Sequence, residues 1–345
     1  MKKVIVTGGA GFIGSHTCVK LVSAGYTPVI VDDLRNSEER SLAGIAKITG
    51  KAPIVHRIDC CDEAAFDRVF AAEGEVYGVI HFAAYKAVGE SVAEPIKYYQ
   101  NNIGSLATLL RLMAKHSVKR IVFSSSCTVY GQPEKLPVTE SSQDRDANSP
   151  YGFTKVVCER LLRDASASDA SLKAVLLRYF NPIGAHPSAH IGELPLGVPN
   201  NLVPFVTQTA AGLRKQLTVF GNDYPTSDGS CIRDYIHVVD LARAHVMALD
   251  WLDKRTGSTC EVFNLGTGMG NSVLEVINAF VEETGVKLPY VIGPRRAGDV
   301  TSVYAETSKS REVLGWKCEH TLRDGLRDAW RWQQEIGRSD DEKIR

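Results

Sequence analysis

Near its amino terminus the chain carries Lys3-Val-Ile-Val-Thr-Gly-Gly-Ala-Gly-Phe-Ile-Gly14, a segment that predicts the fold class. The apolar residues before the first glycine predict a short buried strand, and a helical pattern follows through Ala24. Gly8, Gly11 and Gly14 permit a tight turn, a close approach of the backbone to a pyrophosphate, and close packing of the helix on a sheet. N–H groups at the start of that helix would face the anion. The segment therefore predicts a strand, a turn and a helix that bind a dinucleotide.

An acidic pair follows the second predicted strand. Tyr26-Thr-Pro-Val-Ile-Val31 predicts this strand, and Asp32 and Asp33 come about twenty residues after the glycines, where dinucleotide-binding folds carry an acid. A carboxylate there accepts hydrogen bonds from the adenosine ribose hydroxyls and repels a 2′-phosphate, which favours NAD over NADP. Arg35 is a counter-signal, because an arginine can accommodate that phosphate. The two adjacent carboxylates nevertheless make NAD the expected cofactor.

Strands and helices alternate along the first half of the chain. This alternation predicts an α/β fold with a doubly wound parallel sheet of the Rossmann type, in the strand order 3-2-1-4-5-6. Ligands of such sheets bind outside the carboxyl ends of the strands, where the strand order reverses. The predicted strands lie near residues 3–7, 27–32, 53–57, 76–81, 120–124 and 173–178.

The alternation weakens beyond residue 180, where the chain becomes rich in glycine, proline and histidine up to Pro199. We expect a domain boundary or a lid loop there. The predicted organisation is a dinucleotide-binding domain at 1–180 and a smaller C-terminal α/β domain at 181–337, with segments that return to the first domain. A polar segment at 338–345 is expected to be a fraying tail.

Composition excludes several classes of function. Forty basic residues balance forty acidic ones, so the chain has no electrostatic footprint for nucleic acid or for an anionic membrane. No apolar stretch approaches the length of a membrane span. The eight cysteines show no CxxC spacing, and only Cys60 and Cys61 are adjacent. We therefore expect reduced thiols in a cytoplasmic protein, with neither a disulfide framework nor a metal site.

Tyr151 and Lys155 stand four residues apart in Ser149-Pro-Tyr-Gly-Phe-Thr-Lys155. On a helix this spacing puts both side chains on one face, so the ammonium can sit beside the phenol. A nearby cation would lower the pKa of the phenol toward neutral pH, as a general base acting on an alcohol requires. The alternative is an ordinary exposed helical pair, and the dinucleotide motif argues against it.

Further polar side chains follow the other predicted strands. Asp59 follows the third strand, Phe82-Ala-Ala-Tyr-Lys86 follows the fourth, and Ser124-Ser-Ser126 follows the fifth. In a parallel sheet these positions meet at one edge. Ser126 could hydrogen-bond the substrate hydroxyl there and relay its proton; the alternative is a strand-end serine that satisfies backbone groups. His81 and His237 are expected to be packing or hydrogen-bonding residues, because no partner acid accompanies them.

Six segments together resemble the UDP-glucose 4-epimerases (UDP-galactose 4-epimerases), a family of extended short-chain dehydrogenases/reductases. The glycine and Tyr/Lys motifs are typical of the whole superfamily, whereas the later segments are specific to the epimerases, and the resemblance spans nearly the whole chain. The segments are Gly8–Gly14, Ser124–Gly131, the pair Tyr151 and Lys155, Arg178–Pro182, Phe220–Pro225 and Arg233–His237.

This resemblance implies three sets of site residues. The catalytic residues would be Tyr151, Lys155 and Ser126. The second domain would bind mainly the UDP-sugar, with Arg233 and Arg296 on the diphosphate. Contacts to NAD are implied for Gly8, Gly11, Phe12, Ile13, Gly14, Asp32, Asp33, Asn36, Ser37, Asp59, Cys60, Phe82, Ala83, Ala84, Lys86, Asn101, Ser126, Tyr151, Lys155 and Phe180. Contacts to the nucleotide sugar are implied for Lys86, Ser126, Tyr151, Asn181, Asn201, Leu202, Thr218, Val219, Phe220, Arg233, the segment 296–299 with Arg296 and Asp299, and Val303.

The implied reaction is reversible epimerisation at C4 of UDP-glucose and UDP-galactose in galactose metabolism, through a 4-keto intermediate and transient reduction of tightly bound NAD. The resemblance also implies a homodimer formed through helices near 95–115 and 151–165. Val303 stands where some epimerases carry a bulky tyrosine, so we expect UDP-N-acetylglucosamine and UDP-N-acetylgalactosamine to be accepted as well.

Two other functions compete with the epimerase. A sugar-nucleotide dehydratase or decarboxylase shares the fold and the first oxidation, but it usually needs extra carboxylates beside the active-site hydroxyl. Cys127 and Thr128 follow Ser126 instead, which disfavours elimination. A non-catalytic NAD-sensing protein on the same fold is the second alternative, because fold does not determine function.

Overall fold

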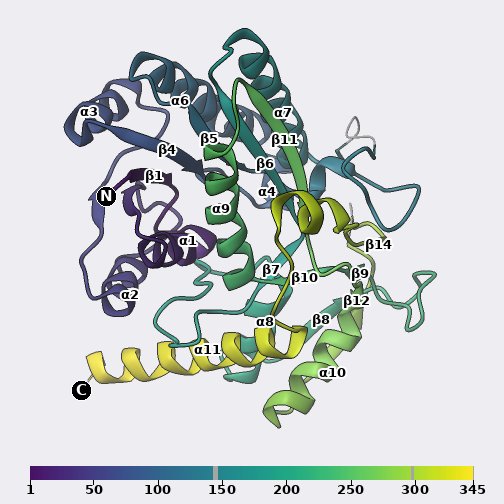
Figure 1. Ribbon diagram of the computed structural model, residues 1–345. Coiled ribbons are helices and arrows are strands. Elements are labelled where there is room, and N and C mark those ends of the chain that lie inside the picture. Colours follow the sequence, from purple (N-terminus) through teal and green to yellow (C-terminus); the bar gives the residue numbers. More distant parts are fainter. Residues whose placement is uncertain (143–146, 297–298, 345) are drawn as a thin grey trace.

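The computed structural model describes residues 1–142, 147–296 and 299–344 (Figure 1). A seven-stranded parallel sheet, in the order β11-β6-β5-β4-β1-β2-β3, forms its larger part. The predicted order 3-2-1-4-5-6 is confirmed, and β11 extends the sheet beyond β6. The strands are β1 (Lys3–Thr7), β2 (Thr27–Val31), β3 (Ile54–His56), β4 (Val76–His81), β5 (Arg120–Ser124), β6 (Lys173–Tyr179) and β11 (Thr259–Leu265).

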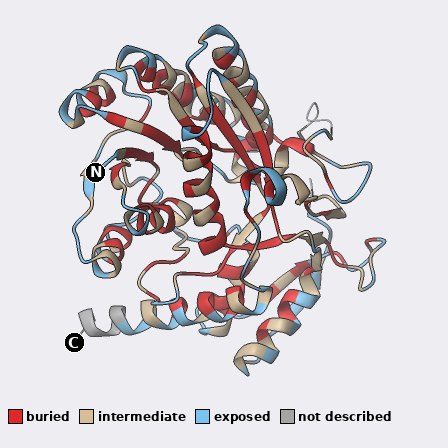
Figure 2. Cartoon of the chain, in the orientation of Figure 1, coloured by how far each residue is buried: buried red, intermediate tan, exposed pale blue. Residues whose placement is uncertain are grey.

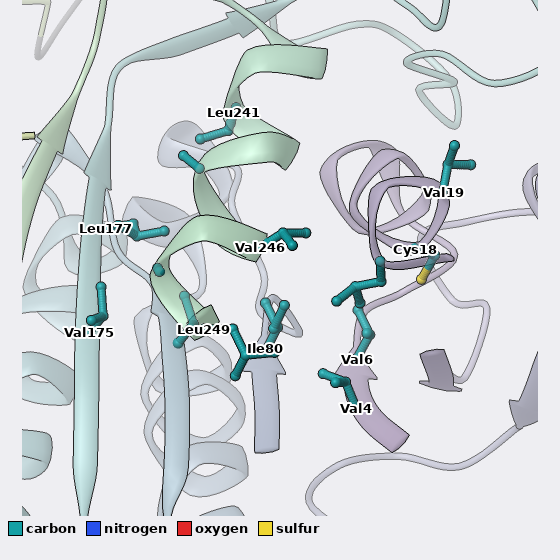
Figure 3. Packing of buried hydrophobic residues seen from close by; sticks show 14 of the residues in the cluster. Val4, Val6, Cys18, Val19, Ile80, Val175, Leu177, Leu241, Val246 and Leu249 are labelled. Carbon is teal, nitrogen blue, oxygen red and sulfur yellow. The ribbon is translucent and has the colours of Figure 1, made fainter. Parts of the chain in front are cut away.

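Helices cover both faces of this sheet, because side chains alternate along each strand. Val4 and Val6 of β1 enter the apolar cluster on the side of α1, α2 and α9, whereas Ile5 enters the cluster on the side of α3, α6 and α7. Figure 3 shows Val4 and Val6 near Cys18 of α1. The inner strands of the sheet are buried from both sides (Figure 2), whereas the edge strand β3 is partly exposed. These helices are α1 (Phe12–Ser23), α2 (Glu39–Thr49), α3 (Glu63–Glu73), α6 (Gly104–Lys115), α7 (Pro150–Ser168) and α9 (Val238–Asp253).

Shorter helical segments connect the main elements of this part. They are α4 (Val88–Ala93), α5 (Pro95–Tyr98), the π-helical η1 (Tyr99–Ile103), the 3-10 helix η2 (Cys127–Tyr130) and the π-helical η3 (Ser310–Leu314).

A smaller α/β part lies beyond the carboxyl ends of the strands (Figure 1), as predicted. Its own core contains Val206, Val219, Ile277, Phe280 and Leu326. It consists of the pair β7 (Asn181–Ile183) and β10 (Tyr235–His237), the sheet β12 (Asn271–Ser272), β9 (Ile232–Arg233) and β14 (Ser302–Val303), the pair β13 (Tyr290–Gly293) and β8 (Leu217–Phe220), and the helices α8 (Leu202–Ala210), α10 (Val273–Thr284) and α11 (Leu322–Ile344).

The chain crosses between the two parts more than once. Both α9 and β11 follow residue 181 in sequence, yet they pack on and within the large sheet. The division at residue 180, with later segments returning to the first domain, therefore remains our proposal for the domain organisation.

The polar tail predicted at 338–345 begins within helix α11. The backbone continues this helix through Ile344 and Arg345 lies outside the described residues, so the fraying of this segment stays a prediction. Each further residue extends an existing helix by one hydrogen bond without a new nucleation step. In the part of the chain that the structure describes, no helix has both the length and the apolar character that a membrane crossing requires.

Candidate active site

The turn between β1 and α1 has the geometry that the glycines predict. Gly8 adopts φ +68°, and its N–H donates to the Val31 carbonyl at 2.8 Å. A Cβ at Gly14 would lie 2.2 Å from the Gly8 carbonyl oxygen, so only glycine allows the helix to pack this closely. The first α-helical hydrogen bond runs from Ser15 N–H to the Gly11 carbonyl at 2.9 Å, which leaves the N–H groups of Phe12 and Ile13 for another acceptor. The turn fits a pyrophosphate.

Asp32 is held at the carboxyl end of β2. One carboxylate oxygen accepts from Ala10 N–H at 3.0 Å, and the other accepts from Leu34 N–H and Ser37 Oγ, each at 2.9 Å. Burial raises the pKa of this carboxyl, and the hydrogen bonds oppose that rise. The acid beside the glycine turn is therefore fixed in position, as an acceptor for the ribose hydroxyls would need to be.

Arg35 does not offer an unpaired charge to a 2′-phosphate. Its guanidinium pairs with both Asp33 and Asp59, and it donates to the Tyr85 hydroxyl at 2.8 Å. Two carboxylates next to one guanidinium leave this corner of the site without net positive charge. The counter-signal in the sequence is thus explained by tertiary contacts, and the geometry supports NAD.

Other predicted cofactor residues follow the neighbouring strands, and one segment of them lies against the glycine turn. A Cβ at Gly8 would lie 2.9 Å from the Ala83 nitrogen, so the segment with Phe82, Ala83 and Ala84 touches the turn. Cys60 is buried after β3, whereas Asn36 is exposed in the loop after β2. Asn101 lies on η1, where its amide donates to Asn102 Oδ1 at 3.0 Å.

Tyr151 and Lys155 lie on the first turns of α7. The helix begins at Pro150, and the Ser149 hydroxyl caps it by accepting from Gly152 N–H at 3.2 Å. Both side chains are buried, with 8% and 4% of their surface exposed. The Lys155 ammonium donates to the Ser124 carbonyl at 2.8 Å and lies 5.9 Å from the centre of the Tyr151 ring. The pair is therefore not an exposed surface pair.

The expected effect of Lys155 on the phenol is wrong for this structure. Burial raises the pKa of Tyr151 above its ordinary value, and the nearby Ser126 hydroxyl acts in the opposite direction. Burial also lowers the pKa of Lys155 to about 8. Both ionisable groups have left water, and the ammonium is directed at the Ser124 carbonyl, so the loss of hydration outweighs the attraction that the spacing suggested.

The three serines after β5 contact three different partners. Ser124 Oγ shares a hydrogen bond of 2.7 Å with the Tyr179 hydroxyl, and Ser125 Oγ donates to Glu159 at 2.6 Å. Ser126 Oγ accepts from Thr128 N–H at 3.2 Å and from the Thr128 hydroxyl at 3.0 Å. The partners bring α7 and β6 to the carboxyl end of β5. Tyr179 was not predicted as a site residue, although it belongs to the Arg178–Pro182 segment.

Residues predicted to bind the diphosphate converge on one carboxylate. Asp299 Oδ1 lies 2.7 Å from Arg296 Nη2 and 3.6 Å from Arg233 Nη2. The Arg296 guanidinium also lies 5.8 Å from the centre of the Phe220 ring. Arg296 and Asp299 are three residues apart, whereas Phe220 and Arg233 come from the ends of β8 and β9, and the four residues form one group. Residues 297–298 of the predicted segment 296–299 lie outside the described residues.

Glu193 is a neighbour of the site that the sequence did not reveal. Its carboxylate lies 3.3 Å from Lys86 Nζ and accepts from Asn201 Nδ2 at 2.6 Å, so it joins two of the predicted residues. Nothing in the local pattern around Glu193 signals this group, because Lys86 lies 107 residues away in the sequence and only tertiary packing brings it to Glu193.

The other predicted sugar residues lie on the second part of the fold. Thr218 and Val219 belong to β8, Asn181 begins β7, and Leu202 begins α8. Val303 on β14 is 5% exposed and shares an apolar cluster with Phe180. Val303 thus packs next to a predicted cofactor residue.

His81 and His237 are buried and hydrogen-bonded within the fold. His81 Nδ1 shares a hydrogen bond of 2.8 Å with Thr7 Oγ1, and burial lowers the pKa of His81 to about 3. His237 Nδ1 accepts from Val239 N–H at 3.1 Å. The expectation that His237 lacks a partner acid is wrong, since its Nε2 lies 3.5 Å from Asp328. Among the described residues, no group of His, Cys, Asp and Glu side chains is arranged to hold a metal ion.

Comparison with known proteins identifies close relatives. The sequence profile of the NAD dependent epimerase/dehydratase family matches residues 4–266. The UDP-glucose 4-epimerase of Dictyostelium discoideum is 52% identical over 332 residues, which cover 96% of this chain and 95% of that protein.

Two solved structures are similar over nearly their whole length. The UDP-glucose 4-epimerase of Stenotrophomonas maltophila, with bound NAD and formylated UDP-arabinopyranose, is 47% identical with a TM-score of 0.94, and the match covers 98% of this chain and 100% of that one. The UDP-glucose 4-epimerase of Bifidobacterium longum, in complex with NAD+ and UDP, is 48% identical with a TM-score of 0.93, and the match covers 97% and 99% of the two chains.

Removing one carboxylate from Arg35 should change the preference between dinucleotides. In Asp33→Ala we expect the affinity for NADP relative to NAD to rise about tenfold, because a less neutralised guanidinium can pair with the 2′-phosphate. Calorimetric titration of dinucleotide-free protein with both dinucleotides measures the ratio. Glu38→Ala, which removes an exposed acid from the same loop, is the matched control. An unchanged ratio in Asp33→Ala, or an equal rise in the control, would contradict the role given to Asp33.

Proposed function

The chain belongs to the NAD dependent epimerase/dehydratase family, and on that premise we propose that it is a UDP-glucose 4-epimerase. It interconverts UDP-glucose and UDP-galactose by inverting C4 of the sugar through a 4-keto intermediate, with NAD bound tightly throughout. The observation that carries the proposal is a buried set of Ser126, Tyr151 and Lys155 at the carboxyl edge of a dinucleotide-binding sheet. Relatives about half identical over nearly the full length are UDP-glucose 4-epimerases.

The chain's own residues would move the proton and hold the substrate. Tyr151, as phenolate, takes the proton of the sugar 4-hydroxyl and later returns it, while Ser126 donates a hydrogen bond to the same oxygen. NAD, when bound, accepts the C4 hydride and gives it back, and its pyridinium ring adds the positive charge that a buried phenolate needs. Lys155, with a pKa lowered by burial to about 8, supplies a second positive charge at neutral pH.

Inversion of the sugar C4 requires that the nucleotide is held while the sugar turns. Arg233 and Arg296 would exchange Asp299 for the diphosphate, which leaves the sugar free to turn and present its other face. The group of Arg233, Arg296 and Asp299 supports this assignment, because it already gathers two guanidinium groups at one point.

Two alternatives are less well supported. A dehydratase or decarboxylase needs a carboxylate beside the active-site hydroxyl, and the neighbour of Ser126 is instead the Thr128 hydroxyl. A non-catalytic NAD-sensing protein would have no use for the buried Ser126, Tyr151 and Lys155. The names of the close relatives also favour the epimerase.

We further propose a cytoplasmic location. All eight cysteines are free, four of them buried, and proteins of oxidising compartments tend to form disulfides. Recovery of the native protein with a secreted or organellar fraction, rather than with the cytosol, would contradict this location.

Tyr151→Phe tests the reaction. The wild-type protein should interconvert both UDP-hexoses, and the variant should lose at least about 10³-fold in kcat while it keeps its NAD, because only the phenolic oxygen is removed. Chromatography of the UDP-sugars measures turnover, and release of the dinucleotide measures its content. Near-normal turnover by the variant would remove Tyr151 from the role of base, and a wild type inactive on both sugars would contradict the function.

Val303→Tyr tests the proposed acceptance of N-acetylated sugars. We expect the wild type to interconvert UDP-N-acetylglucosamine and UDP-N-acetylgalactosamine, and the variant to lose about 10²-fold in kcat/KM for that pair only, since tyrosine would fill the space for the N-acetyl group. Comparison of kcat/KM for both sugar pairs measures the effect. A wild type that ignores the N-acetylated pair would show that Val303 only packs against Phe180.

An apolar surface supports the proposed homodimer. Val92 and Ile96 are 63% and 64% exposed on α4 and α5, beside Phe153 at the start of α7. Exposed apolar side chains gathered on neighbouring helices are typical of an interface. Ile96→Glu should therefore shift the protein from dimer to monomer in sedimentation velocity, whereas Leu213→Glu, an exposed leucine on the other part of the fold, should not. A monomeric wild type would refute the proposal.

A further inference from the structure

A fully buried ion pair lies next to the proposed catalytic residues, one helical turn beyond Lys155 on α7. Glu159 of α7 is 0% exposed and Arg178 of β6 is 1% exposed. Arg178 Nε and Nη2 donate to the two Glu159 oxygens at 2.8 and 2.6 Å, so the pair is bidentate. Burying two charges is so unfavourable that apolar residues of similar size often stabilise a fold as well or better. The pair therefore calls for an explanation other than stability.

Glu159 shares a helix face with the proposed base. Tyr151, Lys155 and Glu159 follow one another at four-residue spacing, which places them in one stripe along α7. Lys155 donates to the Ser124 carbonyl at 2.8 Å, and one turn later Glu159 accepts from the Ser125 hydroxyl at 2.6 Å. The catalytic helix is thus tied at two successive turns to the end of β5, immediately before Ser126.

Arg178 connects the Glu159 carboxylate to β6, the strand that leads to Phe180 and to Asn181, a proposed sugar contact. It stands two residues before Phe180 and three before Asn181 on the strand that leads to them. Its guanidinium also lies 4.9 Å from the centre of the Tyr130 ring in η2, the short helix that Ser126 caps. One carboxylate therefore joins the three elements that carry the base, the hydroxyl and the residues next to the sugar.

We propose that Glu159, held by Arg178, is a positioning residue. It fixes where α7 lies along the sheet, and so how far the Tyr151 phenolic oxygen is from Ser126 and from the sugar C4. The inference rests on the proposed epimerase function. Proton transfer needs the phenolic oxygen within hydrogen-bond distance of the sugar hydroxyl, and a misplacement of about 1 Å lowers a rate about 10²-fold.

Glu159→Gln is the first test. The amide keeps the size of the side chain but turns an NH2 group toward the donors of Arg178 or Ser125, so one of the ties to α7 is lost. We expect kcat for UDP-galactose to fall about 10²-fold. KM should change by less than about twofold and NAD content should be unchanged, because the diphosphate and dinucleotide contacts lie elsewhere.

Arg163→Met is the matched control. Arg163 also donates to Glu159, at 3.0 Å, but the two residues lie one turn apart on the same helix and the Arg163 side chain is 39% exposed, so this contact does not tie α7 to β5 or β6. We expect its kcat to stay within about twofold of wild type.

A pH profile separates positioning from general loss of structure. The Glu159 carboxylate opposes the fall in the pKa of Lys155 that burial causes. Its neutralisation should lower that pKa below about 8, so the decline of kcat on raising the pH should begin at lower pH in Glu159→Gln. A variant that has only lost folded protein would keep the wild-type profile.

Ser125→Ala covers the case in which Glu159→Gln does not fold. It removes one hydroxyl and leaves the ion pair intact, and we expect kcat to fall about tenfold with KM unchanged. Folded Glu159→Gln with wild-type kcat and pH profile, or Ser125→Ala with wild-type kcat, would overturn the positioning role. A wild type that turns over neither UDP-hexose would instead contradict the proposed function, and this inference with it.

Discussion

The hydrogen bond from the Lys155 ammonium to the Ser124 carbonyl is the contact on which the geometry of the site depends. It joins α7, the helix that carries Tyr151 and Lys155, to strand β5 in a place where both Lys155 and Ser124 are buried. A buried ammonium needs such a partner, so the bond restricts how α7 can lie on the sheet. The Tyr151 phenol and the Ser126 hydroxyl are then brought to one edge, which is also where the glycine turn ends.

Because the protein has no net charge, an anionic ligand would be held by individual arginines at the site. The chain as a whole is neutral, yet the arginines around the site are already paired with carboxylates. Arg35 pairs with Asp33 and Asp59, and Arg296 with Asp299. Because of this pairing, the guanidinium groups are hydrogen-bonded before a ligand binds. A ligand must therefore fit the geometry of the guanidinium groups better than the carboxylate does. This favours a specific diphosphate over anions in general.

The two parts of the fold divide the work of the site. The large sheet carries the glycine turn and the proposed catalytic residues, whereas the smaller part carries Arg233 on β9 and Arg296 in the loop after β13. Val303 of β14 and Phe180, which follows β6, belong to one apolar cluster where the two parts meet. A substrate that spans both parts would thus have its nucleotide held by one and its sugar presented to the other.

Residue patterns were enough for the glycine turn and the shared face of Tyr151 and Lys155, because these follow from short-range periodicity and backbone sterics. The alternation of strands and helices was enough for the strand order, because doubly wound sheets share a usual topology. They could not predict that Arg35 is neutralised, that Glu193 joins Lys86 to Asn201, or that burial raises rather than lowers the pKa of Tyr151. Each of these depends on how completely water is excluded and on which distant side chain arrives as a partner. Spacing along the chain carries no information on either, so they emerge only when helices and sheets have packed.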